Sequence, residues 1–224
     1  RSRRQRQMCI RDRRSPVAVI QAVTEEMLEN KNAPDKQGLY TIHHECSHLS
    51  RLIGDLLLLA RVDSGKWSVN KQPVEVDTLV LEVYDRFLPL VEAHHQKLNV
   101  LLPDSVLEPL LLDKQRIEQV LSILIDNAMS YTPAGTQITL TLDISEDSLE
   151  IGVIDNGPGI PDEAKANVFR RFYRLDTSRK SDTHYGLGLS IAYEILKLHG
   201  GRLTLNDSHG GGCNFKLIIT PVKP

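Results

Sequence analysis

A regular series of apolar residues between positions 39 and 60 is the feature that most constrains how this chain can fold. Seven apolar residues follow one another at alternating intervals of three and four: Leu39, Ile42, Cys46, Leu49, Ile53, Leu56 and Ala60. This spacing places all seven on one side of a helix, as in helix bundles and coiled coils. We call this set the seam. Upstream, Ile20, Val23 and Met27 can cover part of it, and the turn-rich residues 30–38 predict a helical hairpin.

The hairpin is expected to span residues 15–65. Two helices bury too little apolar surface to be stable alone, so we expect a homodimer through these residues, which makes a four-helix bundle. Residues 66–73 break the pattern and are interpreted as a linker. Residues 74–224 then form a second domain.

The second domain is predicted to be mixed α/β. Asp77 can cap a helix that runs to about His95, and Asp113 can cap another with apolar residues on one face. Strands are predicted where apolar residues alternate, at 98–102, 138–144, 149–153, 202–206 and 213–220. A helix is predicted over 187–199, after a long irregular loop at 156–185.

Charge and composition limit the functional classes. Seven arginines lie in residues 1–14 although the formal net charge is -2, so the rest of the chain is acidic. A basic head can bind nucleic acid or anionic lipid, and a solvated or foreign tail is the alternative. We expect no direct nucleic-acid binding, because no aromatic residues are interleaved for base stacking. No signal peptide or membrane-length apolar stretch is evident, and three scattered cysteines suit a reducing compartment.

Two glycine pairs bracket the predicted loop. Gly157 and Gly159 follow Asp155 at a strand end, and Gly186 and Gly188 begin a helix. Glycine lets backbone N–H groups approach a ligand closely, and a helix N-terminus favours phosphate. Asp155 can accept a hydrogen bond from an exocyclic amine such as that of adenine. A turn or close packing would explain either pair alone.

Two further groups are candidates for metal binding. Asn127, at the edge of the buried face of its helix, can offer an amide oxygen to Mg²⁺, and a structural asparagine is the alternative. His43, His44 and His48 suggest a metal cluster with Cys46. Because Cys46 lies on the seam and the histidines lie off it, a solvated helix face is the preferred interpretation.

Four motifs resemble the N, G1, F and G2 boxes of sensor histidine kinases, in the same order. They are DNAMSYTPAG at 126–135, DNGPGI at 155–160, VFRRFYRLD at 168–176 and GLGLSIAYEILKLHGG at 186–201. The resemblance covers residues 73–221 as a catalytic ATP-binding domain and 15–65 as the dimerisation and phosphotransfer hairpin. It implies a helical hairpin, a four-helix bundle as dimer, followed by an α/β two-layer sandwich of the histidine kinase ATPase type.

The resemblance also implies ATP and Mg²⁺ as cofactors, and roles for individual residues. These are Asn127 for the metal, Tyr131 beside the nucleotide, Asp155 on the adenine amine, Gly157 and Gly159 at the adenine pocket, Gly186, Leu187 and Gly188 at the phosphate end, Arg174 on the phosphates, and Phe169 and Phe172 as lid-packing residues.

The chain departs from the family pattern at several positions. Ile123 stands where many members have another asparagine, and Ser130 where many have lysine, so we expect modest ATP affinity. His184 replaces the first glycine expected of the G2 box. Arg11 occupies the slot of the phosphoaccepting histidine, followed by Asp12, which keeps the carboxylate that in the family assists proton removal. A guanidinium stays protonated and has no lone pair to accept a phosphoryl group, so no autophosphorylation is expected there.

The resemblance therefore implies the cytoplasmic core of a membrane-anchored sensor histidine kinase, an ATP-dependent protein-histidine kinase that relays the phosphoryl group to an aspartate of a response regulator receiver domain. A degenerate, dimerising ATP-binding scaffold that docks a response regulator is the alternative, and Arg11 favours it. The hairpin disfavours an ATPase of chaperone or topoisomerase type. Residues 1–14 lack the apolar periodicity of a helix and are expected to be a head foreign to the protein.

Overall fold

The computed structural model describes residues 16–29, 36–104, 107–145, 148–175, 185–220 and 222. The chain divides into two compact units, the first ending at Leu58 and the second beginning at Leu59. Arg11, Asp12 and His184 lie outside the described residues. Within the described ranges, no helix has both the length and the apolar character needed to cross a membrane.

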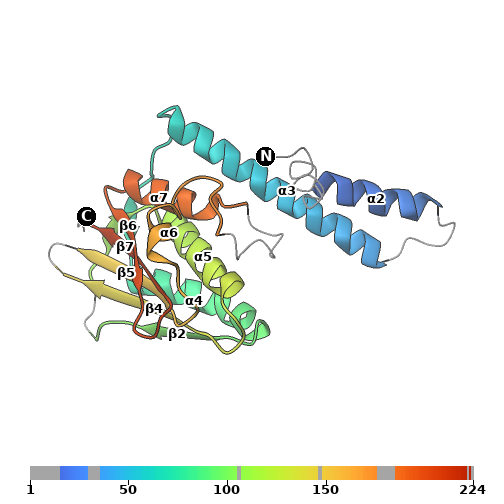
Figure 1. Ribbon diagram of the computed structural model, residues 1–224. Helices are drawn as coiled ribbons and strands as arrows, with labels where there is room; N and C mark the ends of the chain where they lie inside the picture. Colours follow the sequence, from blue (N-terminus) through green and yellow to red (C-terminus); the bar gives the residue numbers. More distant parts are fainter. Residues whose placement is uncertain are drawn as a thin grey trace. The chain divides into compact units, whose positions relative to one another are not determined.

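The predicted helical hairpin is confirmed in the first unit. Helix α2 (Pro16–Glu29) packs against helix α3 (Lys36–Asp63), as Figure 1 shows. The contact is close at Gly38, where a Cβ atom would lie 3.1 Å from the Met27 sulfur and 3.2 Å from a methyl of Val23. Val23 and Met27, two of the three upstream apolar residues, therefore contact α3 at Gly38, next to the first seam residue.

Most of the seam is exposed in the single chain. Leu39, Ile53 and Leu56 are 50%, 55% and 42% exposed, and Cys46 is exposed as well. Apolar residues repeated along one helix face are a surface that a partner can cover. The prediction that the histidines lie on a solvated helix face is wrong for His48, which is buried at 7% exposure. The centroids of the His44 and His48 rings are 4.2 Å apart.

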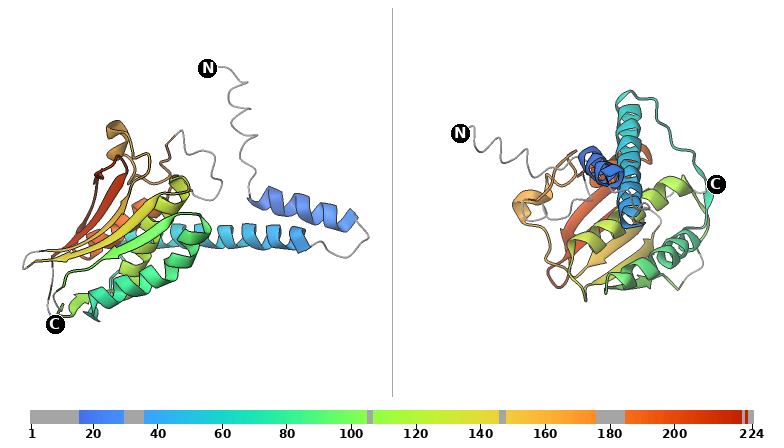
Figure 2. Two further views of the ribbon diagram at one scale, coloured as in Figure 1. Left: turned by 90° about the horizontal axis from the view of Figure 1, so that it is seen from below. Right: turned by 90° about the vertical axis from the view of Figure 1, so that its right-hand side faces the viewer.

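The second unit is the predicted two-layer α/β sandwich. One layer is a five-stranded sheet in the order β2 (Lys97–Leu101), β4 (Gln137–Ile144), β5 (Leu149–Asp155), β7 (Cys213–Ile219) and β6 (Arg202–Asp207). Only β2 and β4 pair in parallel within this sheet. Helices α4 (Val76–Ala93), α5 (Lys114–Tyr131) and α7 (Gly188–Leu198) cover one face, as Figure 2 shows. Alternating side chains of β4 and β7 are buried beneath them, which explains their period-two pattern.

Some local predictions need correction. Asp77 is not a helix cap: α4 begins at Val76 after Glu75, and the Asp77 carboxylate accepts a hydrogen bond from the next backbone N–H. Burial of Val76, which is fully inaccessible, fixes the start of this helix instead. Three short elements were not predicted, namely strands β1 (Gln72–Val74) and β3 (Leu110–Leu112), which pair with each other, and helix α6 (Asp162–Lys165) inside the predicted loop.

The start of α5 is held by contacts from distant segments. Asp113 caps the helix as predicted, and its carboxylate also accepts a hydrogen bond from the backbone N–H of Asn70 at 2.9 Å. The backbone N–H of Asp113 donates to Nε2 of buried His199 at 3.2 Å, and burial lowers the pKa of that histidine. The Arg116 guanidinium lies over the Trp67 ring, and its central carbon Cζ is 5.0 Å from the ring centroid. Residues of the predicted linker are thus bound to the helix that carries much of the candidate site.

Candidate nucleotide-binding site

Asp155 lies at the end of the central strand β5 and is only 5% exposed. Its Oδ1 accepts hydrogen bonds from the backbone N–H groups of Gly157 at 2.9 Å and Cys213 at 3.2 Å. Burial raises the pKa of the carboxyl group, and these two hydrogen bonds oppose the shift. Among the described residues no donor is hydrogen-bonded to Oδ2, so this oxygen can accept a hydrogen bond from a ligand.

The loops around Asp155 approach it too closely for side chains. A Cβ atom on Gly212 would collide with the carbonyl oxygen and the carboxylate of Asp155, and one on Gly157 would collide with the methyl group of Thr132. Ser208 donates to the Asp155 carbonyl oxygen at 2.6 Å. Gly159 meets the same β6–β7 turn, because its Cβ position faces the Gly211 carbonyl oxygen. The end of β5 and the glycine-rich turn between β6 and β7 therefore form one side of the candidate site.

Helix α5 forms a second side of the candidate site. Ile123, Asn127 and Tyr131 are four residues apart, so they lie on one face over about 12 Å of helix. At one end, a Cβ on Gly188 would lie 3.1 Å from Ile123, and at the other, Thr132 meets Gly157. The face therefore runs from the start of α7 to the loop after Asp155. Tyr131 is 36% exposed. Asn127 is half-buried, and its buried Nδ2 has no hydrogen-bond partner among the residues that the structure describes.

The start of α7 combines a glycine of positive φ with a buried leucine. Gly186 has φ of +73°, and its carbonyl oxygen accepts a hydrogen bond from the Phe172 N–H at 2.8 Å. Leu187 is 2% exposed, so its side chain packs in the core. The helix begins at Gly188, where unpaired N–H groups favour an anion.

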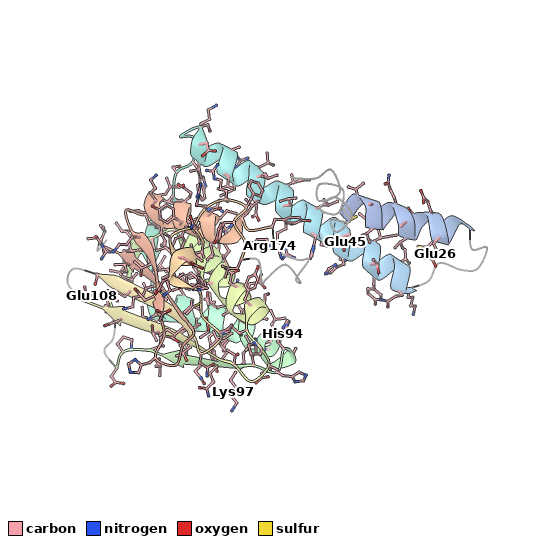
Figure 3. The ribbon with its side chains drawn as sticks, in the orientation of Figure 1. Glu26, Glu45, His94, Lys97, Glu108 and Arg174 are labelled. Carbon is pink, nitrogen blue, oxygen red and sulfur yellow. The ribbon has the colours of Figure 1, made fainter. Side chains whose placement is uncertain are left out.

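The residues of the VFRRFYRLD motif, which precede α7, differ in burial. Phe169 packs against Tyr193 and Phe215, with ring centroids 5.9 Å and 6.5 Å apart, as predicted for a packing residue. Phe172 is 61% exposed with φ of +62°, so the prediction that it packs is wrong. Arg174, labelled in Figure 3, lies between α6 and α7 and is half-buried.

Sequence reasoning missed several residues that build the two sides of the candidate site. Gly212, Ser208 and Thr132 contact Asp155 or Gly157 directly. The glycine-rich turn at 209–212 was a visible signal, but its pattern indicates only a turn between strands. The contacts depend on which strands pair, and that information is absent from local patterns.

Comparisons with known proteins agree with this geometry. Residues 112–223 match the family model described as "Histidine kinase-, DNA gyrase B-, and HSP90-like ATPase", and residues 12–65 match "His Kinase A (phospho-acceptor) domain". Sensor histidine kinase WalK of Bacillus subtilis is 34% identical over 203 residues, which are 89% of this chain and 33% of WalK. The chain spans 33% to 41% of the length of the curated relatives it matches.

Solved structures share the fold. Histidine kinase AdeS of Acinetobacter baumannii is 24% identical with a TM-score of 0.76, over 92% of this chain and 95% of AdeS. Histidine kinase ThkA, in complex with response regulator protein TrrA, is 23% identical with a TM-score of 0.71, over 97% of this chain and 61% of the other.

The Asp155 environment generates a prediction that needs no ligand. Because burial raises its pKa, stability should fall as pH rises from the ordinary value of 3.8 through the raised pKa. Asp155→Asn keeps an oxygen for the two N–H donors and removes the charge, so we expect a higher thermal midpoint at pH 7. Asp143→Asn, an exposed control on β4, should leave the midpoint unchanged. A lower midpoint for Asp155→Asn would mean that the carboxylate gains more from its hydrogen bonds than burial costs it.

Proposed function

The chain belongs to the two-component sensor histidine kinases, and on that premise we propose that its second unit binds Mg-ATP for transfer of the γ-phosphoryl group to a histidine. From that histidine the phosphoryl group passes to an aspartate of a response regulator. The observation that carries the proposal is the buried Asp155, whose Oδ1 is held by two backbone N–H groups while Oδ2 accepts no hydrogen bond from the residues that the structure describes.

In this proposal, the adenine amine donates to Asp155. Gly157 and Gly159 leave room for the base, and Tyr131 lies beside the nucleotide. The phosphates extend along α5 toward Gly186, Leu187 and Gly188, where the backbone N–H groups at the start of α7 bind them. The Arg174 guanidinium binds the phosphates and stabilises the charge that develops during transfer. Positioning and charge stabilisation supply most of the rate in such transfers.

Asn127 fits the proposed metal. The amide oxygen of this half-buried residue is a ligand type that Mg²⁺ accepts, whereas Nδ2, which is buried without a partner among the described residues, is a donor and can serve only an acceptor such as a phosphate oxygen. One protein ligand suffices, because Mg²⁺ retains water and takes oxygens from the nucleotide phosphates. When bound, the ion neutralises phosphate charge. The role of this chain is to hold the asparagine half-buried on the α5 face between Ile123 and Tyr131.

We further propose a domain assignment and partners. Residues 15–65 form a dimerisation and phosphotransfer hairpin, 66–73 a linker, and 74–224 the catalytic domain. The homodimer forms through the seam, and the second partner is a response regulator receiver domain, as ThkA has TrrA. Cytoplasmic placement next to a membrane anchor is part of the same proposal. The matches to histidine kinases do not favour the scaffold alternative, although Arg11 stands in the histidine slot with Asp12 beside it as the carboxylate for proton removal.

Calorimetric titration with Mg-ATP tests the nucleotide site. Loss of a hydrogen bond to a charged acceptor costs about 1.5 to 3 kcal/mol, so Asp155→Ala should weaken ATP binding by roughly 10- to 100-fold. Asp143→Ala, which removes an exposed carboxylate from the adjacent strand, should bind like the unmodified chain. Equal affinity in the two variants would remove Asp155 from the site.

Light scattering tests the homodimer. Replacing two seam residues, Leu49→Glu and Leu56→Glu, places four charges in the bundle and should yield monomers, because unpaired charges are costly to bury. The control is Tyr40→Glu with Ser47→Glu, two exposed positions on the same helix but outside the seam, which should remain dimeric. A monomeric unmodified chain at micromolar concentration would contradict the proposed dimer.

Labelled ATP tests the transfer itself. The chain as written should take no label at position 11, whereas the triple substitution Arg11→His, Asp12→Glu and Arg13→Leu should give acid-labile, base-stable phosphorylation. Adding Asp155→Ala should reduce the label at ATP concentrations below the dissociation constant of the variant. If the restored chain binds ATP and dimerises but stays unlabelled, kinase activity is contradicted, and release of free phosphate would instead indicate an ATPase.

A further inference from the structure

Gln96 is a buried polar residue that none of the assigned roles uses. It lies between the end of α4 and the start of β2, flanked by His94 and Lys97, which Figure 3 labels, and it is 4% exposed. Its side-chain nitrogen Nε2 donates toward four oxygens at the end of α5, which are the carbonyl oxygens of Met129, Thr132 and Pro133 at 3.1, 3.0 and 3.3 Å and the Thr132 hydroxyl at 2.9 Å.

The orientation of this amide is fixed by chemistry. Three of the four oxygens are carbonyl oxygens, which only accept, so the amide nitrogen and not the oxygen must face them. The other end, Oε1, is buried and has no hydrogen-bond partner within the described ranges. A buried polar atom without a partner is rare in native proteins, and an apolar side chain would avoid it. The nitrogen of Gln96 therefore accounts for the presence of an amide at this position.

The contacts of Gln96 continue to the candidate site. Thr132 follows the last residue of α5, and its hydroxyl also donates to the Ala128 carbonyl oxygen at 2.7 Å. The methyl group of Thr132 occupies the space where a Cβ of Gly157 would be, and the Gly157 N–H holds the Asp155 carboxylate. Backbone hydrogen bonds on both sides of Gln96, from Gly135 to His95 and from Lys97 to Thr136, join the same two segments.

We propose that Gln96 is a positioning residue for the nucleotide site, which acts through Thr132 to set the distance between the end of α5 and the loop after Asp155. The proposal rests on the function proposed above. Gln96 touches no nucleotide in this arrangement. It fixes the helix end that carries Tyr131, and it holds the Thr132 methyl group against Gly157.

The test compares Gln96→Met with Gln119→Met in the full chain. Methionine has a similar length and removes both the four-oxygen contact and the unpartnered Oε1. Gln119 is a half-buried glutamine on α5, the helix whose end Gln96 contacts, and its side-chain oxygen accepts a hydrogen bond from Arg116. We expect Gln96→Met to weaken Mg-ATP binding by roughly three- to tenfold, the range for loss of a neutral hydrogen bond, and Gln119→Met to leave it unchanged. Affinity is measured below the unfolding temperature of every variant, so a purely structural role would not change it.

Thr132→Ser tests the path from Gln96 to Gly157, because it keeps the hydroxyl and removes the methyl group. It should weaken ATP binding similarly, and the double variant should lose less than the product of the two single effects, as expected for residues that act through one contact. Full multiplicativity, or unchanged affinity in either single variant, overturns the proposal. If Gln96→Met does not fold, the Thr132→Ser affinity decides.

Hydrogen exchange without nucleotide separates this proposal from the proposed function. Gln96→Met should speed exchange of the backbone N–H groups of residues 131–132, 134–136 and 157, and leave α7 unchanged. Uniform change, or no change at Gly157, overturns the positioning role. If the unmodified chain fails to bind ATP, the proposed function is lost, and these exchange rates alone decide whether Gln96 sets the helix end against the loop.

Discussion

The buried carboxylate of Asp155 is the constraint on which the candidate site depends. Burying this charge is unfavourable, and the N–H groups of Gly157 and Cys213 offset part of the cost. Cys213 lies 58 residues away in the sequence and reaches Asp155 only because Ile154 pairs with Asn214 across β5 and β7. A slip of one residue in this pairing would turn a side chain toward Asp155 and move the donor away. The register of β5 and β7 therefore determines the geometry of the candidate site.

Helix α5 links this site to the core of the second unit. Ile117, Val120, Leu121, Leu124 and Ile125 on its inner face are fully inaccessible, whereas the face with Asn127 is half-buried. Asp113 and His199 hold its start, and Gln96 holds its end. Side chains between two anchored helix ends have little freedom to move, which is the condition for a preorganised binding site.

The elements that could be predicted from sequence have strong local periodicity. The seam, the Asp113 cap and the period-two strands each follow from residues close together in the chain. The strands β1 and β3 have three residues each, which is too few to establish a period. The start of α4 depends on the burial of Val76, whereas the capping pattern had suggested Asp77. Within the site, motif residues such as Asp155 were identifiable, but their roles remain predictions. Gly212, Ser208 and Gln96 were not identifiable, because they act on partners 33 to 53 residues away or through close backbone approach.

Several buried polar atoms near the site lack partners, and this affects how binding and stability are related. Gln96 Oε1, Asn127 Nδ2 and Asn214 Oδ1 are buried without hydrogen bonds in the part of the chain described. Apolar residues at these positions would avoid the cost, so the fold is less stable there than its packing allows. A ligand that pairs with Asp155 and Asn127 would recover part of this free energy in addition to its own contacts. Stability of the second unit should therefore depend on ligand concentration, because the ligand binds the folded state alone.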